Sequence, residues 1–365
     1  MLVGMGLETI NIGFHTPNSF SDLSQKEWCY IREMADKQGV SSIVLDGLNL
    51  LVNTYGKSSI APQIENAWWQ QFVLDWAGMM SMIELSNSRQ MTVMNAMASR
   101  WSESGCKVMV FKGQASAVMY PKPEHRSPGD IDCYLFDNYA KGNDIARAIG
   151  ASVDESWYKH SVISFKGETF ENHQYFVLTR NGKRSKKLEQ ELEDELANNE
   201  TGVIEWGKLS EHVILPPIQW YAMFLTYHSC GHFLTEGLRL KQVLDWAMLL
   251  EKHQEEIDWP RYYAFCDKYH LRKFTEAVTA ICTKYIGVKI RIGQIETESP
   301  LAEKILDSAL YDEDYVFASG EGAWHNRFHL IKNLFRYRWK YNDVYDQSVL
   351  RQLWYDVIGF LVHTE

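Results

Sequence analysis

The sequence predicts an α+β fold, in which a small β-sheet is flanked by largely helical N- and C-terminal regions. Helical spacing of apolar residues fills most of the chain before residue 100 and after residue 210. Short apolar runs bounded by turn residues, typical of strands, gather between residues 102 and 180. At 365 residues and 45% hydrophobic content, the chain is long enough for two or three domains, each with a sizeable core.

Residues 1–100 are expected to be mostly helical after an irregular segment that contains Gly, Pro and Asn. Ser24 to Lys37 predicts a helix, because Ser24 stands three positions before Glu27 in the pattern of a capping box. Ile64 to Trp101 predicts one or two long helices rich in Trp, Met and Ala. Methionines at helical spacing there indicate core packing rather than a ligand site.

The central region begins with a predicted buried strand, Lys107 to Phe111, that runs into a turn at Lys112 and Gly113. A short helix, Gln114 to Tyr120, follows and is ended by Pro121. Glycine at such a strand-to-helix turn lets a phosphate approach the backbone, and a helix N-terminus favours an anion there. The turn is therefore a predicted phosphate contact.

Residues 180–200 run from basic to acidic, and two interpretations stay open. One is a solvated linker or mobile helix with compensating charges. The other has the basic side chains bind an acidic acceptor or nucleic acid; they are Arg180, Lys183, Arg184, Lys186 and Lys187. After Pro216 and Pro217, a good helix start, the chain is expected to be helical to its end. The predicted regions are 1–100, 101–185, 186–210 (a charged linker) and 211–365.

Two carboxylates one residue apart, Asp130 and Asp132, are the most informative feature of the chain. Successive side chains of a strand point to opposite faces, so both aspartates would share a face while Ile131 packs into the core. Paired carboxylates can hold a hard cation such as Mg²⁺, which keeps other positions for substrate phosphates. The motif therefore predicts a divalent metal held against a triphosphate.

A third carboxylate follows downstream, at Glu171. Val162–Phe165 and Thr169–His173 read as a hairpin, which would let Glu171 face the aspartates from a neighbouring strand. The alternative for Glu171 is an exposed strand residue. A second Asp-x-Asp, at Asp312 and Asp314, lacks both the glycine turn and the apolar strand, so it is interpreted as a solvated acidic loop.

These motifs resemble, in order, those of the bacterial uncharacterised nucleotidyltransferase family of the DNA polymerase β-like superfamily. The matching blocks are Val110-Phe111-Lys112-Gly113, Tyr120-Pro121-Lys122-Pro123, Arg126, Gly129-Asp130-Ile131-Asp132, His160, Phe170-Glu171-Asn172-His173, His232-Phe233, Gly237, Leu240-Lys241-Gln242 and Asp245-Trp246. They span roughly residues 60–250. Lys241 replaces the family's usual Arg, Arg239 replaces a small residue, and Lys112-Gly113-Gln114 stands for the superfamily's Gly-Ser pair.

The resemblance implies a mixed-sheet nucleotidyltransferase core in which Asp130, Asp132 and Glu171 hold two Mg²⁺ ions and carry the catalysis. The implied reaction moves a nucleoside monophosphate from an NTP to a hydroxyl acceptor by in-line attack, and Glu171 would also take the acceptor proton. The implied nucleotide contacts are Lys112, Gly113, Arg126, Gly129, Lys241 and Asp245. For Arg126 the alternative is a structural clamp on the Pro-rich loop, and for Lys241 and Asp245 it is a surface ion pair.

Other functions stay open beside this one. A non-catalytic nucleotide- or protein-binding module would keep the fold without turnover. An aminoglycoside-kinase type of phosphotransferase is disfavoured, because no His-x-Asp catalytic loop accompanies a separate metal-binding Asp. His228 and His232 stand on one helical face and could bind zinc with Asp245, although such a pair is more often packed or hydrogen-bonded. The acceptor could be a small molecule, a protein or an RNA end.

Composition narrows the partners further. A net charge of −10 argues against an extensive nucleic-acid surface. Six cysteines without a Cys-x-x-Cys pair indicate a reduced, cytoplasmic protein with no cysteine-based zinc site. The first residues lack a basic segment followed by an apolar run, so no signal peptide is expected. No run of about 18 apolar residues occurs, so no membrane span is expected either.

Overall fold

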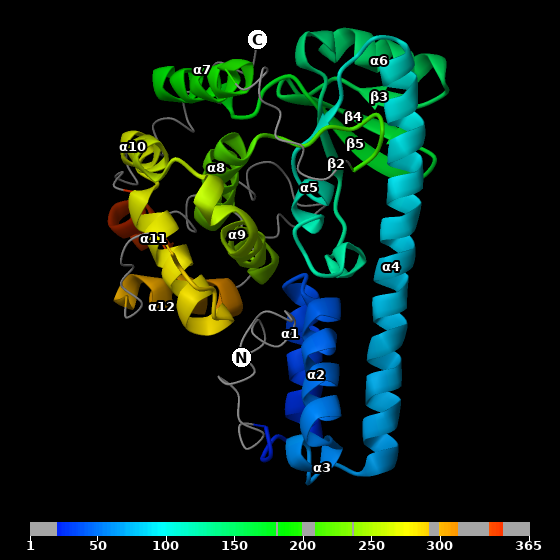
Figure 1. Ribbon diagram of the computed structural model, residues 1–365, viewed down its shortest axis with the longest axis vertical. Coiled ribbons are helices and arrows are strands. Elements are labelled where there is room, and N and C mark those ends of the chain that lie inside the picture. Colours follow the sequence, from blue (N-terminus) through cyan, green and yellow to red (C-terminus); the bar gives the residue numbers. More distant parts are fainter. Residues whose placement is uncertain are drawn as a thin grey trace.

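The computed structural model shows an α+β protein with a five-stranded sheet set among helices (Figure 1). It describes residues 20–179, 182–198, 209–235, 237–291, 299–312 and 336–345. The fold class predicted from the sequence is confirmed. Within the described ranges, no helix is both long and apolar enough to cross a membrane.

Helices account for most of the described elements. They are α1 (Gln25–Lys37), α2 (Ser41–Tyr55), α3 (Lys57–Ile60), α4 (Asn66–Glu103), α5 (Gln114–Ala117), α6 (Tyr139–Ala148), α7 (Lys183–Asn198), α8 (Ile218–Thr235), α9 (Leu240–His253), α10 (Trp259–Tyr269), α11 (Arg272–Ile281) and α12 (Pro300–Tyr311). Short 3₁₀ or π segments are η3 (Pro123–His125), η4 (Phe136–Asn138), η6 (Gln254–Glu256), η7 (Cys282–Ile286) and η8 (Lys340–Val344).

The sheet has the strand order β1-β2-β5-β4-β3 and is mixed. Its strands are β1 (Met109–Val110), β2 (Ile131–Tyr134), β3 (Ser152–Asp154), β4 (His160–Phe165) and β5 (Glu168–His173). Strands β2 and β5 pair in parallel, and the other neighbours pair antiparallel. The predicted hairpin is therefore β4–β5. The predicted first strand is reduced to two residues, and its edge meets Ile214 rather than a further strand.

Helix α4 is one continuous helix of 38 residues. At about 1.5 Å per residue it spans roughly 57 Å, and it joins the N-terminal helices to the sheet along one side of the molecule (Figure 1). The two ends of α4 pack into different hydrophobic cores. Trp69 and Trp76 pack with α1 and α2, whereas Trp101 packs edge-on against Phe170 of β5. Trp101 also donates from Nε1 to the Gly142 carbonyl at 3.0 Å.

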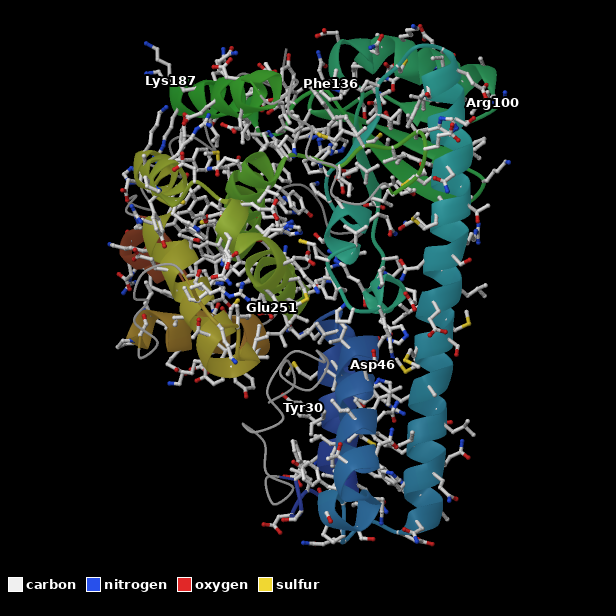
Figure 2. All side chains as sticks on the ribbon, viewed as in Figure 1. Tyr30, Asp46, Arg100, Phe136, Lys187 and Glu251 are labelled. Atoms are coloured by element: carbon white, nitrogen blue, oxygen red, sulfur yellow. The ribbon has the colours of Figure 1, made fainter. Side chains whose placement is uncertain are left out.

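Helix α1 begins as predicted, with a capping box between Ser24 and Glu27. The N-terminal helices are tied to the central region through the Pro-rich loop around η3. Asp46 of α2, labelled in Figure 2, lies 2.8 Å from Lys122 Nζ and also binds His125. Glu84 of α4 binds the other ring nitrogen of His125 at 2.8 Å. The loop before the aspartates is thus held by charges from two N-terminal helices.

Helix α7 makes up most of the charged segment, residues 180–200, for which the sequence left two interpretations open. Its leucines, Leu188, Leu192 and Leu196, are buried, so residues 183–198 form a packed helix rather than a solvated linker. Lys187 is exposed on α7 (Figure 2). Arg180 lies outside the described residues. The boundaries proposed for the regions of the chain stay predictions.

Helices α8 and α9 cover the edge of the central region near β1 and α5. Phe111, just after β1, packs edge-on against Trp220 and Phe224 of α8. Ser116 of α5 shares a hydrogen bond of 2.6 Å with Tyr221. Helix α5 is shorter than predicted, because the backbone tightens to i→i+3 hydrogen bonds after Ala117.

Helices α10, α11 and α12 follow, as the prediction of a helical C-terminal region requires. Of the second Asp-x-Asp, Asp312 lies 3.2 Å from Lys340 Nζ. Glu313 and Asp314 lie outside the described residues.

Candidate active site

A cavity of about 510 Å³ lies where β2 and β5 face helices α8 and α9. On the sheet side it is lined by Lys112, Gly113, Ser116, Arg126, Gly129, Asp130, Asp132 and Glu171. On the helix side it is lined by Leu225, His228, Ser229, His232, Gly237, Arg239, Lys241, Gln242 and Asp245. Every residue that the sequence assigned to metal or nucleotide therefore lines one cavity.

The carboxylates converge because β2 and β5 run side by side. Asp132 on β2 is directly opposite Glu171 on β5 in the parallel register, so the two side chains project from the same face. Asp130 stands immediately before the first residue of β2 and reaches the same cavity. Ile131 and Cys133, which alternate with them, are buried in the core. Period-two alternation thus accounts for the carboxylate face.

Lys112 supplies the positive charge beside these acids. Its Nζ donates to Asp132 Oδ1 and lies 4.0 Å from Glu171 Oε2. Gly113, the next residue, has a φ of +44°, a region that side-chain-bearing residues rarely enter. Glycine is therefore required for the turn that sends the chain from Lys112 into α5.

The two aspartates have opposite electrostatic surroundings. For Asp132, burial opposes ionisation, but the Lys112 ammonium and the His173 ring outweigh it and hold the pKa of Asp132 far below its usual range. For Asp130, desolvation at the cavity wall and the charges of Glu171 and Asp132 raise the pKa above its ordinary value of 3.8. Asp130 is therefore the acid of the pair that most needs an added cation.

Two histidines flank Glu171, and sequence reasoning did not place them in the site. His173 Nε2 lies 3.2 Å from Glu171 Oε2 and 3.0 Å from Asp132 Oδ1. His160 on β4 lies 3.5 Å from Glu171 Oε1, and burial lowers the pKa of His160 to about 4 despite the nearby carboxylate. The spacing of His173 two positions after Glu171 is the signal that could have found it, because alternate strand residues share a face.

Arg126 and Asp245 make a buried, bidentate ion pair across the cavity wall. Arg126 Nε and Nη2 donate to the two Asp245 oxygens at 2.8 and 2.7 Å. Tyr120 also donates to Asp245, at 2.8 Å. Although burial works against it, Asp245 raises the pKa of Arg126 above its ordinary value. The pair joins the loop before β2 to helix α9, which is the clamp that the sequence left as an alternative.

Lys241 lines the cavity, but Asp245 is engaged with Arg126 and Tyr120. Burial and the neighbouring Arg126 lower the pKa of Lys241. Asp245 is buried and orients Arg126, so the alternative of a surface Lys241–Asp245 pair does not describe it. Arg239, which the sequence flagged only as a departure from the family pattern, also lines the cavity.

The remaining histidines sit on α8. His228 Nε2 lies 3.2 Å from His232 Nε2, and burial lowers the pKa of His228 well below its ordinary value. Among the described residues, the group of His and acidic side chains close enough to share a metal ion is His160, Glu171 and His173. The zinc alternative built on His228, His232 and Asp245 does not match that group.

A family model described as "Uncharacterised nucleotidyltransferase" matches residues 24–287, which include the sheet, the cavity and helices α8 to α11. No curated protein and no solved structure matches the chain. The chain belongs to the uncharacterised nucleotidyltransferase family.

Proposed function

We propose that the protein transfers a nucleoside monophosphate from an NTP to the hydroxyl group of an acceptor. The observation that carries this proposal is the convergence of Asp130, Asp132 and Glu171 on one cavity that also holds Lys112. Desolvation and the neighbouring charges of Glu171 and Asp132 raise the pKa of Asp130, a cost that a bound cation would offset. Oxygen donors of this kind fit Mg²⁺.

Two Mg²⁺ ions held by the three carboxylates would neutralise the triphosphate and make the acceptor hydroxyl a better nucleophile. In the proposed reaction the acceptor oxygen forms a bond to the α-phosphorus, the bond to the bridging oxygen breaks, and pyrophosphate leaves. The acceptor proton passes to Glu171 or to solvent. Little covalent chemistry falls to the protein, so positioning and charge stabilisation carry the rate.

The other residues of the cavity wall have separate proposed roles. Lys112 has a flexible four-carbon stem, so its ammonium can exchange Asp132 for a phosphate oxygen. Gly113 and Gly129 leave space for phosphate beside the backbone, and Lys241 supplies charge from α9. We assign Arg126 and Asp245 to holding α9 against β2, because their side chains already bind each other at both oxygens.

Transfer of a labelled α-phosphate tests the proposal. Each of the four NTPs, labelled at the α-phosphorus, is incubated with cell extract, Mg²⁺ and the protein, and both labelled product and pyrophosphate are measured. We expect both to appear with the wild type and to vanish with Asp132→Asn. Asp144→Asn is the matched control, because Asp144 is an exposed carboxylate of α6 outside the cavity.

Release of ADP in place of pyrophosphate would mean phosphoryl transfer and would refute the proposal. Equal labelling by the wild type and Asp132→Asn would refute the assigned role of the aspartate. Nucleotide binding without any product would favour the non-catalytic module.

A further inference from the structure

We propose that His160, Glu171 and His173 form a site for a divalent transition-metal ion that accepts imidazole nitrogen, such as Zn²⁺ or Fe²⁺. This site would adjoin the oxygen-only environment of Asp130. The site itself is argued from geometry alone, and only its contribution to catalysis rests on the proposed function.

The sheet brings the three side chains to one face. His160 of β4 is directly opposite His173 of β5 in the antiparallel register, and Glu171 stands two residues before His173. One ligand atom from each residue lies within 4.8 Å of the other two. Glu171 offers Oε1 to His160 at 3.5 Å and Oε2 to His173 at 3.2 Å. Strand pairing therefore fixes two imidazoles on either side of one carboxylate.

The hydrogen bonds of His173 direct its Nε2 atom at two carboxylates. Its Nδ1 lies 3.1 Å from the carbonyl oxygen of Tyr175, which can only accept, so Nδ1 carries the proton. In a neutral ring, Nε2 then presents a lone pair. That atom faces Asp132 Oδ1 at 3.0 Å and Glu171 Oε2 at 3.2 Å, and both of these are also acceptors. Lys112 Nζ, which binds Asp132 Oδ1 and lies 4.0 Å from Glu171 Oε2, offsets part of the repulsion among these three acceptor atoms, and a metal ion or a second ring proton would offset the rest.

A backbone carbonyl behind a histidine is the usual support of a metal-binding imidazole, since it fixes the tautomer and the ring orientation. His173 has this support and is fully buried. The Nδ1 atom of His160 is buried with no hydrogen-bond partner among the described residues. His160 lacks such a support, so its place in the proposed site rests on the 3.5 Å approach of its Nε2 to Glu171 Oε1 and on its position opposite His173 in the strand register.

The donor set selects the ion. Mg²⁺ prefers oxygen donors in near-octahedral geometry, whereas imidazole suits ions such as Zn²⁺ and Fe²⁺. Asp130 lies outside the group that contains the imidazoles. The proposed pair of Mg²⁺ ions is thereby revised, because one of the two metal positions would hold a transition metal instead. The position at Asp130 favours Mg²⁺, and the position at Glu171 favours a transition metal.

Cobalt binding tests this site without any turnover. Metal-free protein, with no nucleotide present, is titrated with Co²⁺ in a large excess of Mg²⁺, and visible d–d absorption and equilibrium dialysis report the bound ion. We expect one Co²⁺ to be retained against Mg²⁺ and to be displaced by Zn²⁺. His160→Gln and His173→Gln should each weaken Co²⁺ binding at least tenfold, since even residues behind a metal ligand change affinity by about 10–100-fold.

His232→Gln is the matched control, because it alters a cavity imidazole outside the group and should leave the Co²⁺ spectrum unchanged. Circular dichroism checks that each variant is folded, and His160, only part-buried, keeps the test open if His173→Gln unfolds. Displacement of Co²⁺ by Mg²⁺, or a spectrum that neither substitution alters, would overturn the site and leave a second proton on His173 as the explanation of its contacts.

Asp130→Asn separates this inference from the proposed function. It should abolish nucleotidyl transfer yet retain the Co²⁺ spectrum, because Asp130 lies outside the imidazole group. A histidine-dependent Co²⁺ site in a protein that shows no transfer would refute the function alone. Transfer without such a site would refute the transition-metal inference alone.

Discussion

Asp130 and Asp132 carry the same side chain two positions apart, yet their surroundings move their pKa values in opposite directions. Lys112 and His173 overcome the burial of Asp132 and lower its pKa, whereas desolvation and two neighbouring carboxylates raise the pKa of Asp130. An acid whose folded pKa is raised costs stability once the pH exceeds its unfolded value. Ionised Asp130 therefore destabilises the folded state at neutral pH, but its negative charge can bind a cation.

Asp130→Asn should raise the thermal midpoint at pH 7 when divalent ions have been removed, because it relieves both the desolvation of a charged group and its repulsion from Glu171 and Asp132. The gain should shrink as the pH falls toward 3.8, where the native carboxyl becomes neutral. Mg²⁺ should stabilise the wild type more than the variant. Calorimetry with and without Mg²⁺ measures both effects, and a lower midpoint for the metal-free variant would contradict this assignment.

Gly113 offers a second test at the level of one residue. Gly113→Ala should destabilise the protein by about 1–3 kcal/mol, because alanine is strained at a φ of +44°. Gly129→Ala is the matched control, since that glycine has no positive φ and a Cβ there would meet open space. Urea unfolding compares the two. Equal losses would show that the backbone conformation of Gly113 is not the cause.

Part of the site could be predicted from residue patterns alone. Alternation along a strand predicted that Asp130 and Asp132 share a face, and the predicted hairpin let Glu171 face them. In the structure all three line the cavity beside the Lys-Gly turn. Their catalytic roles stay predictions. The spacing of His173 from Glu171 was a usable signal, but the position of His160 opposite His173 could not be predicted, because it depends on the register of the hairpin. Local periodicity carries no information on that pairing.

Among the elements, the loop before β2 and helix α9 are joined by the ion pair of Arg126 and Asp245, which stand 119 positions apart in the chain. Both side chains are almost fully buried, and Tyr120 adds a hydrogen bond to the same carboxylate. Breaking a buried pair leaves an uncompensated charge and is costly, even where the intact pair adds little net stability. The two halves of the cavity wall are therefore expected to separate when either partner is lost.

Arg126→Gln and Asp245→Asn should each destabilise the protein by about 3–5 kcal/mol, and the double variant by much less than their sum. Arg126→Lys should not restore the wild-type stability, because an ammonium cannot reproduce the bidentate contact. Urea unfolding of the four proteins measures the coupling. Strictly additive losses would show that the two groups do not act as a pair.

Elements were predicted best where the local signal was strong. The capping box fixed the start of α1, and α4 stays one helix because no proline interrupts it. Strand β1 was overestimated, since its apolar run does not reveal that the sheet ends there. The charged face of α7 concealed three buried leucines at helical spacing, which a reading of charge alone overlooked.

Across the whole molecule, the N-terminal helices are linked to the central region by His125, which lies between Asp46 and Glu84. The hydrogen bond to Asp46 raises the pKa of His125, with Glu84 adding to the effect and burial opposing it. A histidine with a raised pKa contributes stability that is complete below its unfolded value near 6.5 and is lost as the pH rises through its folded value. The docking of these helices should therefore weaken in mildly alkaline solution.

Hydrogen exchange at pH 6 and pH 9, corrected for the intrinsic exchange rate, should show weaker protection of α2 at the higher pH. His125→Gln should remove most of that difference, because glutamine does not titrate. Lys122 also binds Asp46, so some contact is retained. Equal pH dependence in the wild type and His125→Gln would contradict the proposed link.

The α+β class and the family were accessible from ordered motifs in the sequence, and both are confirmed. The spatial arrangement of the helices and strands could not be predicted from the sequence. The parallel pairing of β2 with β5 and the closure of the cavity by α8 and α9 join segments far apart in the chain, and such contacts leave no periodic signal.

Single-turnover transfer by Glu171→Gln tests the central claim most directly, namely that three converging carboxylates perform nucleotidyl transfer. Glu168→Gln is the matched control, because Glu168 belongs to the same strand, falls on its opposite face and pairs with Arg89 at 3.0 Å. With labelled NTP at saturation, we predict a rate at least about 10³-fold below the wild type for Glu171→Gln, at the upper end of what one stabilising group supplies, and little change for Glu168→Gln. A Glu171→Gln rate close to that of the wild type would contradict the account.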